Sequence, residues 1–402
     1  MYSTQIILLL TAFLLTINKA GTSPCIVTID GPDWPAKPAI LTNHKGETSL
    51  PSGDEEERVL VFGLNEQFEL SCPGTYLTIG PRNVWIECVE DSTFMWWEKD
   101  SPEIVDLANF AELGCKRTPS DEAQIIGTCG QNEEFDLIHI GFDVASDDMI
   151  EMVEVCHDIA AARTLWSRHV LLDEIKFQDK NNERPKWDGD FFNFDADHAY
   201  SMDTQWETFS TLLGSPLLAD FFLPGGEYYL ARGHLAPNAD YIFYSWMDST
   251  FYLINAAPQW QCFNARNWAY LEESIRDFTI LHSMDYIIYT GTYGVMELPD
   301  INNNPTRIFL YEDKLPVPNF YWKIVYSPSE NKGIAAVGVN NPYIVENLDD
   351  FIICPPIESH ALLDRIPDAG DVTKGLLYLC KVGDLTKIIE YIPDLPALDL
   401  LE

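Results

Sequence analysis

The chain has 402 residues, of which 46% are hydrophobic and 12% aromatic, and its formal net charge is −38. This apolar content suffices for one large or two ordinary packed domains, so an intrinsically disordered chain and a coiled coil are excluded. A protein that binds polyanions through a broad basic surface is also excluded, because long-range repulsion would oppose each encounter. Chemistry on an anionic polymer would therefore have to depend on a few local cations or a metal ion.

Residues 1–20 predict a secretory signal peptide. The apolar run from Ile6 to Ile17 is shorter than the roughly 20 residues that cross a bilayer, and small residues follow it near Ala20. A membrane anchor in this segment is the alternative interpretation. We expect a mature chain that is secreted, extracellular and not bound to a membrane.

The cysteines predict a disulfide framework. In a secreted chain, the nine cysteines would form at most four pairs with one left over. None of them has the Cys-x-x-Cys or Cys/His spacing of a zinc site. The sequence leaves the pairing open among Cys25, Cys72, Cys88, Cys115, Cys129, Cys156, Cys262, Cys354 and Cys380.

Two regions with different patterns follow the signal peptide. Residues 21–130 contain short strand-like runs such as RVLVF and NVWIECV between Pro, Gly and acidic turns, which predicts a small disulfide-braced β-rich region. Residues 131–402 mix strands and helices. There, FDLIHIGFDV alternates as a strand, and a helix is expected to begin near Asp147. The fold class is therefore α+β.

The clearest helix is predicted between Asn264 and Met284. Apolar side chains recur there at spacings of three and four residues, which places them along one face of a helix. These side chains are Trp268, Leu271, Ile275 and Phe278. Strand-like runs precede this helix at YYLARGH and STFYLINAAPQ and follow it at DYIIYTGTYG, NFYWKIVYS and GIAAVGV.

A first candidate site lies in the segment ARGHLAP. Arg232 and His234 are two residues apart at the end of a predicted strand, so both side chains are expected on the same side. Gly233 between them allows a close approach of another group. A neutral imidazole can take a proton from water, and a guanidinium can hold a phosphate oxygen. The alternative is an ordinary packed or surface Arg-x-His pair.

A second candidate site lies on the predicted helix. Asn264, Glu272 and Arg276 fall on roughly one helical face. One interpretation makes Asn264 a side-chain oxygen ligand of Mg²⁺, which keeps most of its water shell and accepts one or two protein ligands. The other interpretation makes Asn264 a helix cap and Glu272–Arg276 a solvated ion pair.

Taken together, the motifs RGHLAP, NAAPQWQ and NARNWAYLE resemble the DNA/RNA non-specific endonuclease family, and within it the secreted arthropod nucleases for double-stranded RNA. The resemblance implies a ββα-metal nuclease core, Mg²⁺ as cofactor, and double-stranded RNA or DNA, bound without sequence specificity, as substrate. It implies that His234 is the general base and that Asn264 is the only direct protein ligand of the metal.

The same resemblance implies roles for the other motif residues. Arg232 and Arg276 would steady the phosphate, and Glu272 would orient metal-bound water. Arg184 would make a further phosphate contact. Asn255 and Gln259 would support the loop between the strand and the helix.

The chain departs from the family pattern at two positions. Ala231 stands where many members have Asp before Arg-Gly-His, and Arg266 stands where relatives commonly have Gly. Arg266 would either crowd the hydrated metal or bind substrate phosphate itself. The alternative function is therefore a secreted nucleic-acid-binding protein on a nuclease scaffold, with weak or no cleavage.

Overall fold

The computed structural model describes residues 23–53, 58–98, 101–144, 149–179, 184–217, 221–223, 226–395 and 399–402, so the predicted signal peptide lies outside the described residues. The chain divides into two compact units. Unit 1 comprises Met1–Asp121 and Phe142–Ile150, and unit 2 comprises Glu122–Gly141 and Glu151–Glu402. The first segment of unit 1 ends at Asp121, and the strand after Asp121 pairs within the sheet of unit 2. The domain boundary near residue 130 stays a prediction.

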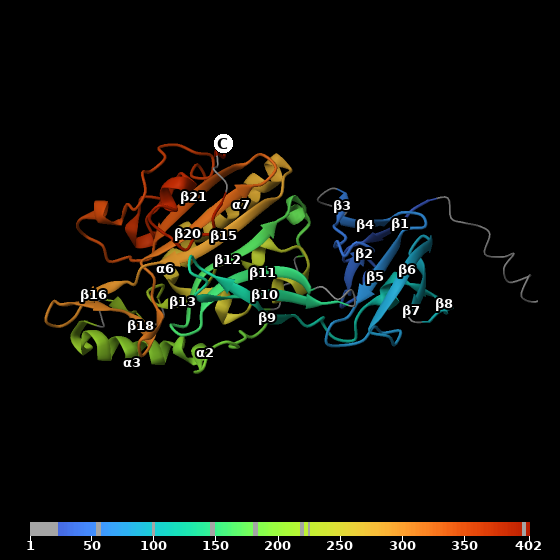
Figure 1. Ribbon diagram of the computed structural model, residues 1–402, viewed down its shortest axis with the longest axis horizontal. Coiled ribbons are helices and arrows are strands. Elements are labelled where there is room, and N and C mark those ends of the chain that lie inside the picture. The colour runs from blue at the N-terminus through green and yellow to red at the C-terminus, as the bar shows by residue number, and fades with distance from the viewer. Residues whose placement is uncertain are drawn as a thin grey trace, which may run out of the picture. The chain divides into compact units, whose positions relative to one another are not determined.

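Unit 1 is built from two antiparallel sheets (Figure 1). Along β6 (Asn83–Glu90), Val84, Ile86 and Cys88 are buried and alternate with half-buried neighbours, as a strand with one covered face requires. The three-stranded sheet has the order β1 (Cys25–Thr28), β4 (Arg58–Phe62) and β3 (Ser52–Gly53). The five-stranded sheet has the order β2 (Ile40–Asn43), β5 (Gln67–Ser71), β6 (Asn83–Glu90), β7 (Thr93–Glu98) and β8 (Ser101–Asn109).

Unit 2 is organised around one nine-stranded sheet (Figure 1). All of its pairings for which the register is described are antiparallel except that of β23 (Asp399–Leu400) with β21. The order of the other strands is β22 (Leu377–Cys380), β21 (Lys332–Val339), β20 (Phe320–Ser327), β15 (Tyr286–Tyr293), β12 (Arg163–Leu171), β11 (Met149–Asp158), β10 (Phe135–Asp143) and β9 (Glu122–Cys129).

The helix expected near Asp147 is wrong. Residues 145–148 lie outside the described residues, and the next residues form strand β11. Val153 and Val155 are buried on either side of the half-buried Glu154, which is the period of a strand. The pairing of β11 with β12 therefore overrides the local helical pattern.

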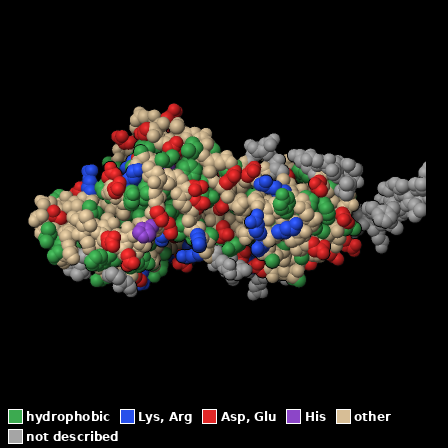
Figure 2. Space-filling view, turned by 90° about the horizontal axis from the view of Figure 1, so that it is seen from below, with side chains coloured by type: hydrophobic (Ala, Val, Ile, Leu, Met, Phe, Trp, Pro, Cys, Tyr) green, Lys and Arg blue, Asp and Glu red, His purple; other side chains and the backbone are tan. Residues whose placement is uncertain are grey.

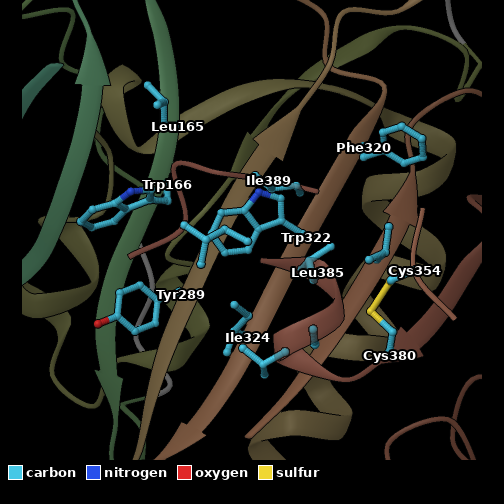
Figure 3. Packing of buried hydrophobic residues seen from close by; sticks show 14 of the residues in the cluster. Leu165, Trp166, Tyr289, Phe320, Trp322, Ile324, Cys354, Cys380, Leu385 and Ile389 are labelled. Atoms are coloured by element: carbon cyan, nitrogen blue, oxygen red, sulfur yellow. A yellow bond between two sulfur atoms is a disulfide. The ribbon is translucent and has the colours of Figure 1, made fainter. Parts of the chain in front are cut away.

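Alternate residues of β20 serve two different layers. Trp322 and Ile324 belong to a buried cluster with Trp166, Leu385 and Ile389, which Figure 3 shows from close by. Tyr321 and Lys323 point to the opposite face, because the chain alternates along a strand. The Tyr321 ring lies 5.5 Å from that of Trp268, at the start of the long helix. One central strand thus joins the main core to the layer that carries the candidate site.

The predicted long helix is confirmed as α7 (Ala269–His282), and the four apolar residues of the predicted stripe are buried. The other described helices are α2 (Ala196–Ala199), α3 (Met202–Leu213), α5 (Tyr244–Asp248), α6 (Gln261–Phe263), a π-helical turn η6 (Asn264–Trp268) and α8 (Val382–Leu385). Across the described ranges, no helix combines the length and apolar character required to span a bilayer.

Short elements complete the fold. Three two-stranded ribbons are β13 (Leu230–His234) with β14 (Ala256–Trp260), β16 (Glu297–Pro299) with β17 (Pro305–Arg307), and β18 (Phe309–Tyr311) with β19 (Lys314–Pro316). The 3₁₀ turns are η1 (Phe110–Leu113), η2 (Asp173–Phe177), η3 (Ser215–Leu217), η4 (Asn238–Asp240), η5 (Leu253–Asn255), η7 (Leu348–Phe351) and η8 (Val372–Lys374).

The disulfide expectation is confirmed. Unit 1 contains Cys25–Cys88 and Cys72–Cys115, and unit 2 contains Cys129–Cys156 and Cys354–Cys380. Cys262 is the free cysteine and is buried. The predicted α+β class with a disulfide-braced β-rich N-terminal region is also confirmed.

The tight packing around Gly291 in β15 yields a stability prediction. A Cβ atom there would lie 2.2 Å from the Leu165 carbonyl oxygen and 2.4 Å from Trp322 Cζ2, so Gly291→Ala requires the backbone or the indole to move. We expect the free energy of unfolding to fall by about 1–3 kcal/mol. Denaturant unfolding measures this change.

Gly127→Ala is the matched control, since it also lies in a strand but has no atom within 4 Å of the added Cβ. We expect it to change the free energy of unfolding by less than about 1 kcal/mol. Equal effects of the two substitutions would contradict the packing described for Gly291.

Candidate active site

Five predicted site residues line one cavity of unit 2, with a volume of about 1020 Å³. They come from four separate segments, and their side chains are those of Arg184, Arg232, His234, Asn264 and Glu272. The cavity therefore brings an imidazole, a carboxamide, a carboxylate and two guanidinium groups together. Of the remaining predicted residues, Asn255, Gln259, Arg266 and Arg276 are not among those that line it.

A two-stranded hairpin carries the imidazole. Strand β13 (Leu230–His234) pairs antiparallel with β14 (Ala256–Trp260), and His234 lies opposite Ala256. Gly233 is required here because an added Cβ would lie 2.3 Å from Gln259 Oε1 and 2.9 Å from the Tyr321 hydroxyl. The buried Gln259 side chain thus fills the space beside Gly233.

Asn255 fixes the chain immediately after His234. Its Nδ2 donates to the carbonyl oxygens of Ala236 and Thr250, both at 2.9 Å. Its Oδ1 accepts from the Ala236 amide at 3.0 Å and from Ser167 Oγ at 2.9 Å. This fully buried carboxamide therefore uses both ends to hold the loop, and the buried site makes each bond costly to lose.

Two aromatic rings hold the His234 imidazole. The centroid of the imidazole lies 4.6 Å from that of Trp187 and 5.0 Å from that of Phe251. Burial among these rings, followed by the nearby charge of Arg184, lowers the pKa of His234 to about 3. Nε2 has no hydrogen-bond partner among the described residues. The imidazole is therefore neutral at neutral pH and positioned by ring contacts.

The π-helical turn η6 presents Asn264 at the cavity wall. The turn interrupts the helix, with Arg266 at φ −120° and ψ −106°, and such turns are frequent at functional sites. Asn264 Nδ2 donates to Gln261 Oε1 at 3.1 Å. With its nitrogen held in this way, the carboxamide oxygen is the atom that Asn264 can offer to a cation.

Glu272 lies eight residues after Asn264, on α7. Burial is the largest cause that raises the pKa of its carboxyl, Lys323 and Arg276 lower this pKa and the carboxylate of Asp240 raises it, and the net result is a pKa of about 7. A carboxyl group with a pKa near neutrality responds readily to any further positive charge. Glu272 is therefore poised to ionise when a cation enters the cavity.

The Glu272–Arg276 ion pair of the alternative interpretation is not among the ion pairs of the described residues. Arg276 Nη1 pairs instead with Asp240 Oδ1 at 2.9 Å, and Asp240 Oδ2 is 2.9 Å from His169 Nε2. Asp240 is buried, so this arrangement supplies the hydrogen bonds that a buried carboxylate needs. Arg276 lies behind the wall of the cavity and not in it.

Lys323 was not identified from the sequence. It is 1% exposed, and its Nζ donates to Thr290 Oγ1 at 2.6 Å and to the Leu235 carbonyl at 3.4 Å. The same ammonium lies 5.4 Å from the centroid of the Trp268 ring. Lys323 therefore contacts the residue after His234 and the end of the turn that carries Asn264. The feature of the sequence that could have identified Lys323 is its position as a lone Lys within the apolar run NFYWKIVYS.

The two guanidinium groups at the cavity differ in their partners. Arg232 donates to the Asp197 carbonyl at 2.9 Å and to the Asp197 carboxylate, and it lies 5.0 Å from the Tyr200 ring centroid. Its Nε has no hydrogen-bond partner in the described part of the chain. Arg184 is exposed, and no carboxylate of the described residues pairs with it.

Arg266 points to a carboxylate outside the cavity. Its Nη2 lies 2.7 Å from Glu227 Oε1, and its Nε lies 3.3 Å from Glu227 Oε2. This two-point pairing occupies the guanidinium at the surface. It therefore holds the side chain away from the residues that line the cavity.

The residues present fit a hydrated Mg²⁺ ion. Asn264 and Glu272 line the same cavity and offer only oxygen donors, and Mg²⁺ prefers a few oxygen ligands while it retains several waters. The lining includes one imidazole and no thiolate, so it does not match the donor set that zinc prefers.

The chain is similar to known nucleases over most of its length. A sequence model of the DNA/RNA non-specific endonuclease family matches residues 133–384. A salivary endonuclease of Lutzomyia longipalpis is 30% identical over 331 residues, which cover 81% of this chain and 76% of that protein. Salivary protein Tsal2A of Glossina morsitans morsitans is 22% identical over 345 residues, which cover 84% of each chain.

Among solved structures, a chain from the EndoG/EndoGI complex matches with 20% identity and a TM-score of 0.33, covering 47% of this chain and 72% of that chain. The family match spans more than half of the sequence and includes the hairpin, the π-helical turn and α7. The chain therefore belongs to the DNA/RNA non-specific endonuclease family, whose members are phosphodiester hydrolases.

Proposed function

We propose that this chain is a secreted, Mg²⁺-dependent endonuclease that hydrolyses double-stranded RNA or DNA without sequence specificity. The observation that supports this proposal most strongly is that His234, Asn264 and Glu272 line one cavity, although His234 lies far from the other two in the sequence. The salivary relatives and the four disulfides support secretion.

His234 acts as the general base in this proposal. Its neutral imidazole can accept a proton from the attacking water, but a pKa of about 3 makes it a weak base in the free protein. A bound phosphate would counter the charge of Arg184, which is one cause of the low pKa. Substrate binding therefore raises the proton affinity of His234 at the moment when a base is required.

Asn264 and Glu272 would hold the hydrated metal, Asn264 directly and Glu272 through water. When bound, Mg²⁺ stabilises the charge that develops on the phosphate and the leaving oxygen. The cavity-facing guanidinium groups of Arg184 and Arg232 would bind phosphate oxygens. Arg276 would act indirectly, since it anchors Asp240 behind α7.

The alternative is a nucleic-acid-binding protein with little cleavage, which Arg266 and the acidic surface motivated. The pairing of Arg266 with Glu227 favours the catalytic function, because that guanidinium is engaged outside the cavity. Tight binding of duplexes with turnover far below that of an active relative would select the alternative.

The first prediction concerns the base and the metal ligand. His234→Ala should lower kcat on long duplex RNA and on plasmid DNA at least about 100-fold, because proton transfer to a positioned base is lost. Asn264→Ala should act similarly and weaken Mg²⁺ binding, and EDTA should abolish cleavage by the wild type. His44→Ala, an exposed histidine of unit 1, is the control. Cleavage that persists in His234→Ala or in EDTA refutes the mechanism.

The second prediction concerns pH. The Glu272 carboxyl has a pKa of about 7, so protons compete with Mg²⁺ increasingly as the pH falls below that value. Calorimetry should show Mg²⁺ affinity that levels off above pH 7 and falls by up to about tenfold per pH unit below it. In Glu272→Gln the affinity should be weaker and independent of pH. If the Mg²⁺ affinity of Glu272→Gln still depends on pH, a group other than Glu272 titrates, and the prediction is contradicted.

The third prediction concerns Lys323 as a positioning residue. Lys323→Met keeps the length of the side chain but removes the charge that lowers the Glu272 pKa. We expect kcat to fall about tenfold or more, and the midpoint of the pH-dependent Mg²⁺ affinity to move upward. Lys323→Arg should restore the midpoint in part. A midpoint that does not move would show that Lys323 only supports the fold.

A further inference from the structure

Most Lys and Arg side chains of the described residues pair with a carboxylate. Among residues 163–187, Arg163, Arg168 and Lys176 pair with Asp158, Glu151 and Asp173. Arg184, at the cavity of unit 2, and Lys186 have no carboxylate partner among the described residues. In a chain with a net charge of −38, unpaired cations that lie together are therefore unusual.

One such group lies on unit 1, around the Cys72–Cys115 disulfide. It consists of Lys37, Lys116 and Arg117, which are exposed and have no carboxylate partner among the described residues. We call these three cations, with the exposed ring of Tyr76, the unit 1 patch. Figure 2 shows Lys and Arg side chains gathered on this unit, on the right of the view.

Backbone hydrogen bonds hold the three segments of the patch side by side. The Cys115 amide donates to the Lys37 carbonyl at 2.7 Å, and the Lys116 amide donates to the Tyr76 carbonyl at 2.9 Å. The Cys72–Cys115 disulfide ties Cys115 to the segment that leads into Tyr76. The positions of the cations are therefore set by the covalent and hydrogen-bonded framework and not by flexible loops.

Two of the three cations contact neighbouring groups of the patch. Lys116 Nζ lies 5.9 Å from the centroid of the Tyr76 ring, and Arg117 Nη2 donates to the Gly74 carbonyl at 2.9 Å. The Tyr76 residue is 58% exposed. The neighbouring carboxylate of Glu112 is turned to the Asn109 amide, at 3.1 Å, where it caps a 3₁₀ turn.

We propose that the unit 1 patch is an accessory docking site for the phosphate backbone of nucleic acid, separate from the cleavage site. Clustered cations bind phosphates, and an exposed aromatic ring beside them can stack on an unpaired or terminal base. An anionic glycan or membrane offers the charge but no base to stack, so the ring favours nucleic acid. The inference rests on the proposed function for the identity of the polymer.

The test compares two triple variants of the full chain. Lys37→Gln/Lys116→Gln/Arg117→Gln removes the patch, and Lys332→Gln/Lys381→Gln/Lys387→Gln removes the same charge from the surface of unit 2. Fluorescence anisotropy in EDTA measures the Kd of a long RNA duplex, a long DNA duplex, heparin and phosphatidylserine vesicles over a range of salt concentrations. Thermal unfolding checks that each variant folds.

We expect the patch variant to bind both duplexes about tenfold or more weakly at low salt. The slope of log K against log salt should become shallower by about 2 to 3, because about 0.9 counterions are released per phosphate contact. The control variant should change the Kd by less than about twofold. Equal losses in the two variants would overturn the proposal, as would a loss of heparin or vesicle binding with unchanged duplex binding.

A cleavage assay, combined with the binding measurements, distinguishes a failure of the docking site from a failure of the proposed nuclease function. If the wild type cuts a short duplex in Mg²⁺ and the patch variant binds long duplexes as the wild type does, the docking site is refuted and the nuclease function stands. If the wild type cuts nothing but the patch variant loses duplex binding, the docking site stands and the nuclease function is refuted.

Discussion

The Asn255 carboxamide is the interaction on which the geometry of the candidate site depends. It joins the loop after His234 to the central sheet through Ser167 and to the preceding turn through Thr250. A carboxamide that is fully buried and bonded at both ends tolerates only one arrangement of its partners, because an unmade bond leaves a desolvated polar atom. The hairpin that presents the imidazole is thereby fixed against the sheet, and the cavity forms on its open side.

Side chains of strand β20 contact both this hairpin and the turn before α7. Its Tyr321 hydroxyl donates to the Ala257 carbonyl of β14 at 2.8 Å, and its Lys323 ammonium reaches the Leu235 carbonyl. Both side chains also lie against Trp268, at the end of the turn that carries Asn264. His234 and Asn264, the proposed base and metal ligand, are thus supported by the same strand, whose opposite face packs into the main core. The buried charges of Lys323, Asp240 and Arg276 in this layer have partners of opposite charge or hydrogen bonds, which compensate the cost of removing them from water.

The sequence predicted the parts of the site that carry local patterns. The apolar stripe along the long helix and the strand that ends at His234 depend on short-range spacing, and the structure contains both. Asn264, which was expected to open that helix, lies instead in the π-helical turn that precedes α7. Lys323, Asp240 and His169 were missed, because their roles arise from contacts between segments far apart in the chain. The helix expected near Asp147 failed for the same reason, since the pairing of β11 with β12 decides the conformation there. The partner of Arg266 was also unpredictable, because Glu227 lies 39 residues away.

A crystal soaked in Mn²⁺ tests the central claim most directly, because the anomalous signal locates a substitute for Mg²⁺ without any assay of activity. The account predicts a peak in the cavity of unit 2, bonded to Asn264 Oδ1, with water between the ion and Glu272. The cluster of His139, Glu151 and Glu154, outside the cavity, could also hold a cation and serves as an internal comparison. Arg168 already pairs with Glu151 there. A peak at that cluster with none at Asn264 would contradict the account.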